Sequence, residues 1–300
     1  MSSGQQSSRL LDPKVLSKLS GLYLVAKTVV EGFISGLHRS LYRGFSVEFA
    51  GHREYVAGDD LRYLDWKVFG RTDRTYIRVF REETNVKTHL LLDISRSMEY
   101  SSGPVSKKQY AIWLAACLSY LMISQKDAVG LVVFDTDIRR LVKPASTTSH
   151  LHHLLSNLEH LPGGTTTSLS SVLHLIASNI KRRSLIILIS DLLDEPEEVI
   201  RGLVHFRHHH HEIIVFHILD PAELEFSFTG QFQFLDMETG ERLDGDGLAL
   251  RAGYQKAMAN FLHRYQKQCA ANNISYARAI TRTPFDYFLY QYLSLRARTF

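Results

Sequence analysis

The chain has 300 residues, of which 45% are hydrophobic and 22% are charged. These proportions are those of an ordinary globular protein and exclude a disordered, collagen-like or disulfide-rich chain. The formal net charge of +4, from 35 basic and 31 acidic residues, is too balanced to indicate a nucleic-acid-binding protein.

Residues 1–42 are expected to form an N-terminal helical segment. Apolar residues between Leu10 and Leu37 recur at steps of three and four, which describes one face of a helix. Asp12 and Pro13 provide an N-cap and a first-turn proline. The polar start lacks the basic-then-apolar order of a signal peptide, so we expect a cytoplasmic protein.

Residues 43–85 differ in kind, because short aromatic and β-branched runs alternate there with Gly-Asp turns and dense charge. This pattern indicates a small β-rich element of short strands and irregular loops. Its arginines, between Arg71 and Arg81, are interleaved with acidic residues, which favours a solvated face and not a nucleic-acid site.

Residues 86–300 are expected to form one large domain. Apolar runs of strand length alternate with segments of helix length, and this order predicts an α/β fold with a doubly wound, mostly parallel sheet and helices on both faces. The predicted strands are 86–92, 128–134, 184–190, 213–219 and 274–280. The predicted helices are 106–126, 148–159, 168–181, 196–207, 248–271 and 285–297.

Three further features of this domain follow from its sequence. The alternating aromatics and the Glu-Thr-Gly turn at about 222–246 predict an inserted β-hairpin. The longest uncharged run, 109–125, is shorter than the ~20 apolar residues of a membrane span, so we predict a buried helix and no span. Cys117 and Cys269 show no ligand spacing and are expected to be free thiols in a reducing compartment.

Oxygen-bearing side chains follow the predicted strands at their carboxyl ends. Asp93 ends the first strand, and Ser95 and Ser97 follow at alternate positions, so that one tight loop can direct all three to one point. Thr165 follows a Gly-Gly turn, and Asp191 ends the third apolar strand. Hard oxygen donors suit Mg²⁺ or Mn²⁺, so these five residues are a candidate metal site. The alternative is that they cap the helices that follow them.

The order and spacing of these five residues resemble the metal-ion-dependent adhesion site of a von Willebrand factor A domain. The resemblance covers about residues 86–280, including the strand-like run 127–134. It implies a six-stranded doubly wound sheet. It also implies that the metal binds an acidic residue of a partner protein.

A second resemblance lies upstream, to the bacterial domain-of-unknown-function-58 family, which places such a segment directly before an A-like domain. The matching signature residues include Asp59, Asp60, Arg62, Asp65 and Trp66. The density of charge around them favours a structural ion-pair network, with contact to a partner or a metal as the alternative. Members of this family are often linked with MoxR-type AAA+ ATPases, which the resemblance implies as a partner.

The 15 histidines suggest zinc, and four of them form the run His208–His211. Consecutive residues of an extended segment point to opposite faces and cannot converge on one tetrahedral ion, so we predict a solvated turn there.

The sequence contains no P-loop, dinucleotide-binding, zincin or α/β-hydrolase motif. A haloacid-dehalogenase-like phosphatase would carry a second Asp where this chain has Ser95. We therefore expect a non-enzymatic interaction module that binds through Mg²⁺ and serves, for example, as an adaptor for a MoxR-type ATPase. The alternative is a metal-dependent phosphoryl-transfer or hydrolytic enzyme that uses the same site.

Overall fold

The computed structural model describes residues 21–36, 52–54, 70, 75–78, 87–165, 168–237, 240–285 and 287–289. The chain divides into two compact units, one of Met1–Gly36 with Val86–Phe300 and one of Leu37–Asn85. In the second unit, β1 (His52–Glu54) pairs antiparallel with β2 (Tyr76–Arg78). The five signature residues between 59 and 66 lie outside the described residues.

A six-stranded sheet forms the centre of the larger unit, with the strand order β10-β7-β6-β3-β4-β5. Its parallel strands are β3 (Lys87–Asp93), β4 (Ala128–Phe134), β6 (Ser184–Ser190), β7 (Glu212–Leu219) and β10 (Ser275–Ile280). The edge strand β5 (Ile138–Ala145) runs antiparallel to β4. Every residue of β6 is buried, as expected of a central parallel strand covered on both faces. The predicted α/β fold is confirmed.

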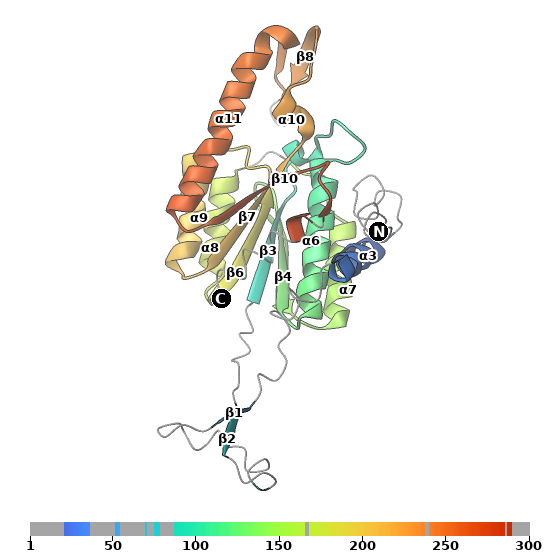
Figure 1. The fold of residues 1–300 in the computed structure, drawn as a ribbon. Coiled ribbons are helices and arrows are strands. Elements are labelled where there is room, and N and C mark those ends of the chain that lie inside the picture. Colours follow the sequence, from blue (N-terminus) through green and yellow to red (C-terminus); the bar gives the residue numbers. More distant parts are fainter. Residues whose placement is uncertain are drawn as a thin grey trace. The chain divides into compact units, whose positions relative to one another are not determined.

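Helices cover both faces of this sheet (Figure 1). The helices of one side are α6 (Lys107–Ser124), α7 (Thr148–Glu159) and α3 (Leu22–Gly36). Those of the other side are α8 (Leu169–Asn179), α9 (Pro196–His208) and α11 (Gly247–Ala271). Helix α6 is buried on most of its sides, as its uncharged sequence predicts. Among the described residues, no helix has the length and apolarity that crossing a membrane requires.

The chain leaves β7 through a short helix, α10 (Pro221–Glu225), and then forms a hairpin of β8 (Gln231–Leu235) and β9 (Arg242–Asp246). Helix α10 falls at the start of the range where we expect the hairpin. It forms because Asp220 accepts a hydrogen bond from Ala222 N, while Glu223 accepts one from Asp220 N. This short helix places Glu223 at the carboxyl end of β7, next to the predicted metal site.

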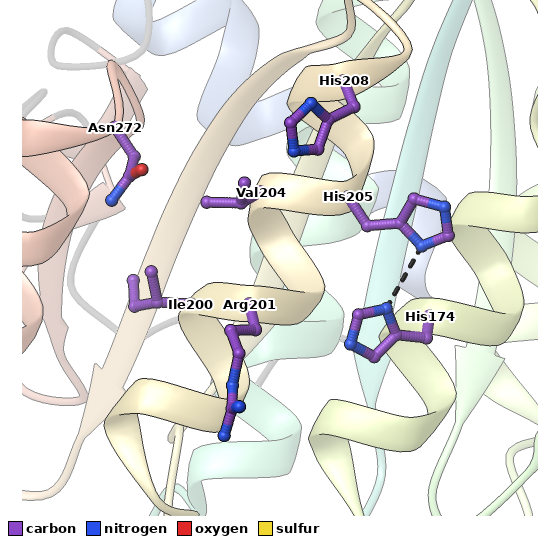
Figure 2. Close-up of a pocket in the computed structure, with 7 residues that line it drawn as sticks. All are labelled: His174, Ile200, Arg201, Val204, His205, His208 and Asn272. Carbon is purple, nitrogen blue, oxygen red and sulfur yellow. Dashed lines mark hydrogen bonds between the residues drawn. The ribbon is translucent and has the colours of Figure 1, made fainter.

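The histidine run is only partly the solvated turn that we predict. His208, His209 and His210 are exposed, but His211 is fully buried. Its Nδ1 accepts a hydrogen bond from Ser184 N at 3.0 Å, and its Nε2 lies 2.9 Å from the carbonyl oxygen of Ile180. The prediction is therefore wrong for His211, because the last residue of the run turns into the core as β7 begins. Two other histidines, His174 of α8 and His205 of α9, face each other between those helices (Figure 2).

Candidate metal-binding site

The register of the parallel strands brings the predicted site residues to one edge of the sheet. Leu92 of β3 pairs with Ile189 of β6, so Asp93 and Ser190 lie side by side at the ends of these strands. The hydroxyl of Ser190 donates a hydrogen bond of 2.6 Å to Asp93 Oδ2. Asp191 follows Ser190 in the chain. The buried carboxylates of Asp93 and Asp191 therefore lie at the ends of two neighbouring strands.

The loop after β3 directs three side chains inward. The backbone N–H of Ser95 donates to Asp93 Oδ1 at 2.8 Å, which closes a tight turn of the kind that Asp side chains favour. The Oγ atoms of Ser95 and Ser97 lie 3.1 Å apart. All three residues are buried, although they are polar. The alternate spacing in the sequence thus places the three side chains close together.

Thr165, in the loop between α7 and α8, lies beside the loop that follows β3. Its carbonyl oxygen accepts a hydrogen bond of 2.9 Å from the backbone N–H of Arg96. Gly164 packs directly against the β3 loop, and an added Cβ there would overlap the carbonyl oxygen of Ile94. An added Cβ at Gly163 would meet nothing within 4 Å. The second glycine of the Gly-Gly turn is therefore the one that the close approach requires.

Asp135, which was not among the predicted site residues, holds the side chain of Thr165 in place. It follows β4, and its Oδ2 accepts a hydrogen bond of 2.8 Å from Thr165 Oγ1. Its Oδ1 accepts one of 2.6 Å from Arg139 Nε. Burial opposes the ionisation of Asp135, but the hydrogen bonds from Arg139 and Thr165 outweigh it and lower its pKa to about 2. The position of Asp135 after a buried parallel strand was the signal that could have found it.

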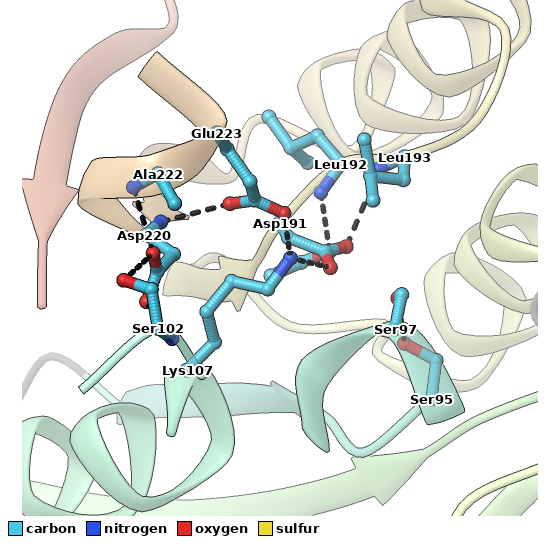
Figure 3. A network of polar contacts seen from close by, with 11 residues as sticks. Ser95, Ser97, Ser102, Lys107, Asp191, Leu192, Leu193, Asp220, Ala222 and Glu223 are labelled. Atoms are coloured by element: carbon cyan, nitrogen blue, oxygen red, sulfur yellow. Dashed lines mark hydrogen bonds and ion pairs between the residues drawn. The ribbon is translucent and has the colours of Figure 1, made fainter. Parts of the chain in front are cut away.

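Asp191 belongs to a buried ion-pair network (Figure 3). The ammonium group of Lys107, at the first turn of α6, lies 2.8 Å from Asp191 Oδ2 and 2.6 Å from Glu223 Oε1. The side chain of Lys107 is fully buried. Lys107 and Glu223 were also missed, because nothing in the sequence connects the start of α6 with the end of β7.

Negative charge exceeds positive charge in this network. Lys107 pairs with two carboxylates, those of Asp191 and Glu223, and Asp93 lies near enough to Asp191 for the charge of one to act on the other. Burial, and then the nearby charge of Asp191, raise the pKa of Asp93 to about 7. A buried surplus of negative charge is costly unless a cation compensates it. One divalent cation has the charge that would offset two ionised carboxylates.

The donor atoms of the five residues are of the type that Mg²⁺ or Mn²⁺ takes. Ligands at the 2.0–2.1 Å distance of an octahedral Mg²⁺ stand about 2.9 Å apart at adjacent corners. The Oγ atoms of Ser95 and Ser97 have nearly this separation, 3.1 Å. Carboxylate and hydroxyl oxygens are also the ligands that hard divalent ions prefer. Within the described part of the chain, no three His, Cys, Asp or Glu side chains are grouped to hold a metal, and the predicted set contains two carboxylates only.

Helix capping does not account for the two hydroxyl loops. Ser95 is the N-cap of a 3₁₀ turn (Arg96–Glu99), yet its side chain makes no capping hydrogen bond. The N-cap of α8 is Ser168, and Thr165 instead donates to Asp135. The N-cap of α9 is Glu195, four residues after Asp191. The side chains of Ser95, Thr165 and Asp191 therefore do not cap the helices that follow them.

The strand order, the antiparallel edge strand and the loops at the carboxyl ends of the parallel strands define a von Willebrand factor A-like fold. A family model described as protein of unknown function DUF58 matches residues 51–264. The chain belongs to this family.

The chain is 27% identical over 232 residues to the uncharacterized proteins Rv1480 of Mycobacterium tuberculosis and Mb1516 of Mycobacterium bovis. Each alignment covers 76% of this chain and 73% of the relative.

The similar solved structures include the following three. The first is an aerotolerance-related membrane protein of Bacteroides fragilis (19% identity, 70% of this chain and 98% of that one, TM-score 0.48). The second is the conserved hypothetical protein BatB of Bacteroides thetaiotaomicron (16% identity, 71% and 99%, TM-score 0.45). The third is the vWF domain of the type V pili tip protein Mfa5 of Porphyromonas gingivalis (14% identity, 71% and 94%, TM-score 0.37).

Proposed function

We propose that this chain is a protein-interaction module that binds its partner through a divalent metal ion at the edge of the sheet. The observation that supports this most directly is the joint placement of Asp93, Ser95 and Ser97 beside a buried network with surplus negative charge. Thr165 and Asp191 extend this donor set from two neighbouring loops.

The five residues would contribute to metal binding in two ways. Asp93 and Asp191 would supply negative charge to Mg²⁺ or Mn²⁺, whereas Ser95, Ser97 and Thr165 would supply neutral oxygens. Bound there, the ion would offer an exchangeable position to an additional oxygen ligand. The ligand that we propose for this position is a carboxylate of a partner, as the resemblance to the metal-ion-dependent adhesion site implies.

The partner that we propose is a MoxR-type AAA+ ATPase presenting a Glu or Asp side chain. The basis is the resemblance of the upstream segment, because members of this family are often linked with such ATPases. In this proposal the chain acts as an adaptor during the assembly or remodelling of complexes. It makes and breaks no covalent bond.

The metal site is tested by thermal unfolding of the full chain in EDTA and in Mg²⁺. A ligand that binds the folded state alone raises the melting temperature by mass action. Mg²⁺ should therefore raise the melting temperature of the wild type and not that of Asp93→Ala or Ser95→Ala. Ser124→Ala, which removes an exposed hydroxyl on α6, is the matched control and should respond as the wild type does. An equal shift in all four proteins would exclude the site.

The interaction is tested by capture on the immobilised chain. Partner binding should disappear in EDTA, return with Mg²⁺ and be absent from Thr165→Ala. If the partner binds equally well in EDTA, the interaction does not use the metal. A parallel screen with phosphate esters and nucleotides in Mg²⁺ tests the enzymatic alternative, which turnover that depends on Asp93 would favour.

A further inference from the structure

Two histidines from different helices meet on the side of the sheet that α8 and α9 cover (Figure 2). Nδ1 of His174 lies 3.2 Å from Nδ1 of His205, and the centroids of the two rings are 5.3 Å apart. His174 is exposed and His205 is half-buried, so solvent reaches the pair. Neither residue belongs to the run His208–His211 that stands out in the sequence.

The packing of α8 against α9 fixes this pair. An added Cβ at Gly202 of α9 would lie 2.9 Å from Cβ of Leu173 in α8, so the two helices touch at this glycine. His174 is the residue after Leu173, and His205 lies one helical turn after Gly202. The close contact therefore brings both imidazoles to the same level of the two helices.

The two nitrogens are within hydrogen-bond distance of each other, and their separation also matches that of two ligands on one metal ion. Imidazole nitrogens bind Zn²⁺ at 2.0–2.1 Å, which sets two nitrogens of a tetrahedral site about 3.3–3.4 Å apart. The observed 3.2 Å is close to this value. We propose that His174 and His205 form a two-histidine site for a borderline transition metal ion, Zn²⁺ in the first place, with water completing the coordination.

The surroundings are compatible with a cation. Arg201 lines the same pocket, but Glu198 forms an ion pair with it and offsets its charge. Within the described residues, no group of three His, Cys, Asp or Glu side chains is arranged to hold a metal, which is why two protein ligands are assigned here. This site differs in chemistry from the one at the sheet edge, because imidazole nitrogen favours Zn²⁺ whereas hydroxyl and carboxylate oxygens favour Mg²⁺.

The consequence of binding is a cross-link between α8 and α9. Each helix contributes one ligand, so the ion binds the folded packing of these helices and stabilises it by mass action. The wild-type chain, without an affinity tag, should therefore bind Zn²⁺ in calorimetric titration and unfold at a higher temperature in its presence.

The variants His174→Ala and His205→Ala test the assignment. Loss of a residue that only orients a ligand costs about 10–100-fold in metal affinity, and loss of a ligand should cost at least as much. His263→Ala, which removes an exposed histidine of α11, is the matched control and should bind Zn²⁺ like the wild type. Gly202→Ala keeps both imidazoles but forces the helices apart, and its Zn²⁺ affinity should fall as well.

Equal Zn²⁺ affinity in wild type, His174→Ala and His205→Ala would overturn the proposal, and so would loss of binding in His263→Ala alone. Asp93→Ala separates this site from the one at the sheet edge. That variant should lose its response to Mg²⁺ and keep its response to Zn²⁺, whereas His174→Ala should show the reverse.

Discussion

The ammonium group of Lys107 lies 2.8 Å from Oδ2 of Asp191, and both side chains are buried. The same ammonium group contacts Glu223, so one lysine joins the first turn of α6 to the ends of β6 and β7. Burial alone would lower the pKa of Lys107, but the charges of Asp191 and Glu223 outweigh burial and raise it. Lys107 therefore stays charged and holds in place one of the two carboxylates that we assign to the metal.

Replacement of this lysine should be costly. Lys107→Met keeps most of the side-chain volume but leaves Asp191 and Glu223 without their shared partner. Breaking a buried ion pair by removing one member typically costs about 3–5 kcal/mol, and we expect a loss of this size in the free energy of unfolding in urea. Arg183→Met breaks the exposed pair with Glu212 and should cost less than about 1 kcal/mol. Similar losses in the two variants would show that the buried network contributes no special stability.

The two glycines of the loop before Thr165 provide a second test. Gly164→Ala places a methyl group on the carbonyl oxygen of Ile94, whereas Gly163→Ala places one in open space. Overpacking of this kind costs about 1–3 kcal/mol. We expect Gly164→Ala to lower the free energy of unfolding by that amount and to weaken the thermal response to Mg²⁺, because the loop that carries Thr165 must move away from Ser95. Gly163→Ala should retain both properties. The contact has no role in metal binding if the two variants respond equally to Mg²⁺.

Much of the fold follows from the sequence, because its parallel strands are continuous apolar runs. The predicted strand 128–134 matches β4, and the predicted strand 184–190 matches β6. Strand β5 was missed, since an edge strand has one exposed face and carries charge and proline. Its residues alternate between partly buried and exposed, and Pro144 near its end suits a strand with only one neighbour.

Some residues of the candidate site can likewise be predicted from the sequence, and others cannot. The ends of buried strands point to Asp93 and Asp191, because parallel strands end at one edge of the sheet. Lys107 could not be distinguished in advance from its neighbour Lys108, although the first is fully buried and the side chain of the second is 12% exposed. Which of two adjacent lysines turns inward depends on where α6 docks. The pair His174 and His205 depends likewise on the packing of two helices and has no local sequence signal.

The pH dependence of the Mg²⁺ response should report the ionisation of Asp93. Burial and the charge of Asp191 raise the pKa of this carboxyl from 3.8 to about 7 in the metal-free fold. Between these values the folded chain binds the proton more tightly than the unfolded chain does. The contribution of Asp93 to stability is therefore present at low pH and is lost as the pH rises through about 7.

Metal binding reverses this dependence, because the ion needs the ionised carboxylate. The increase in melting temperature caused by Mg²⁺ should thus be small at about pH 5.5 and complete at about pH 8, on either side of the shifted pKa of Asp93. His89 and His217, whose pKa values burial lowers to about 4 and about 3, also make stability depend on pH. Comparison of samples with and without Mg²⁺ at each pH cancels their contribution. Asp93→Asn should remove the Mg²⁺ response at both pH values. A wild-type response of equal size at both would mean that Asp93 is already ionised in the metal-free protein.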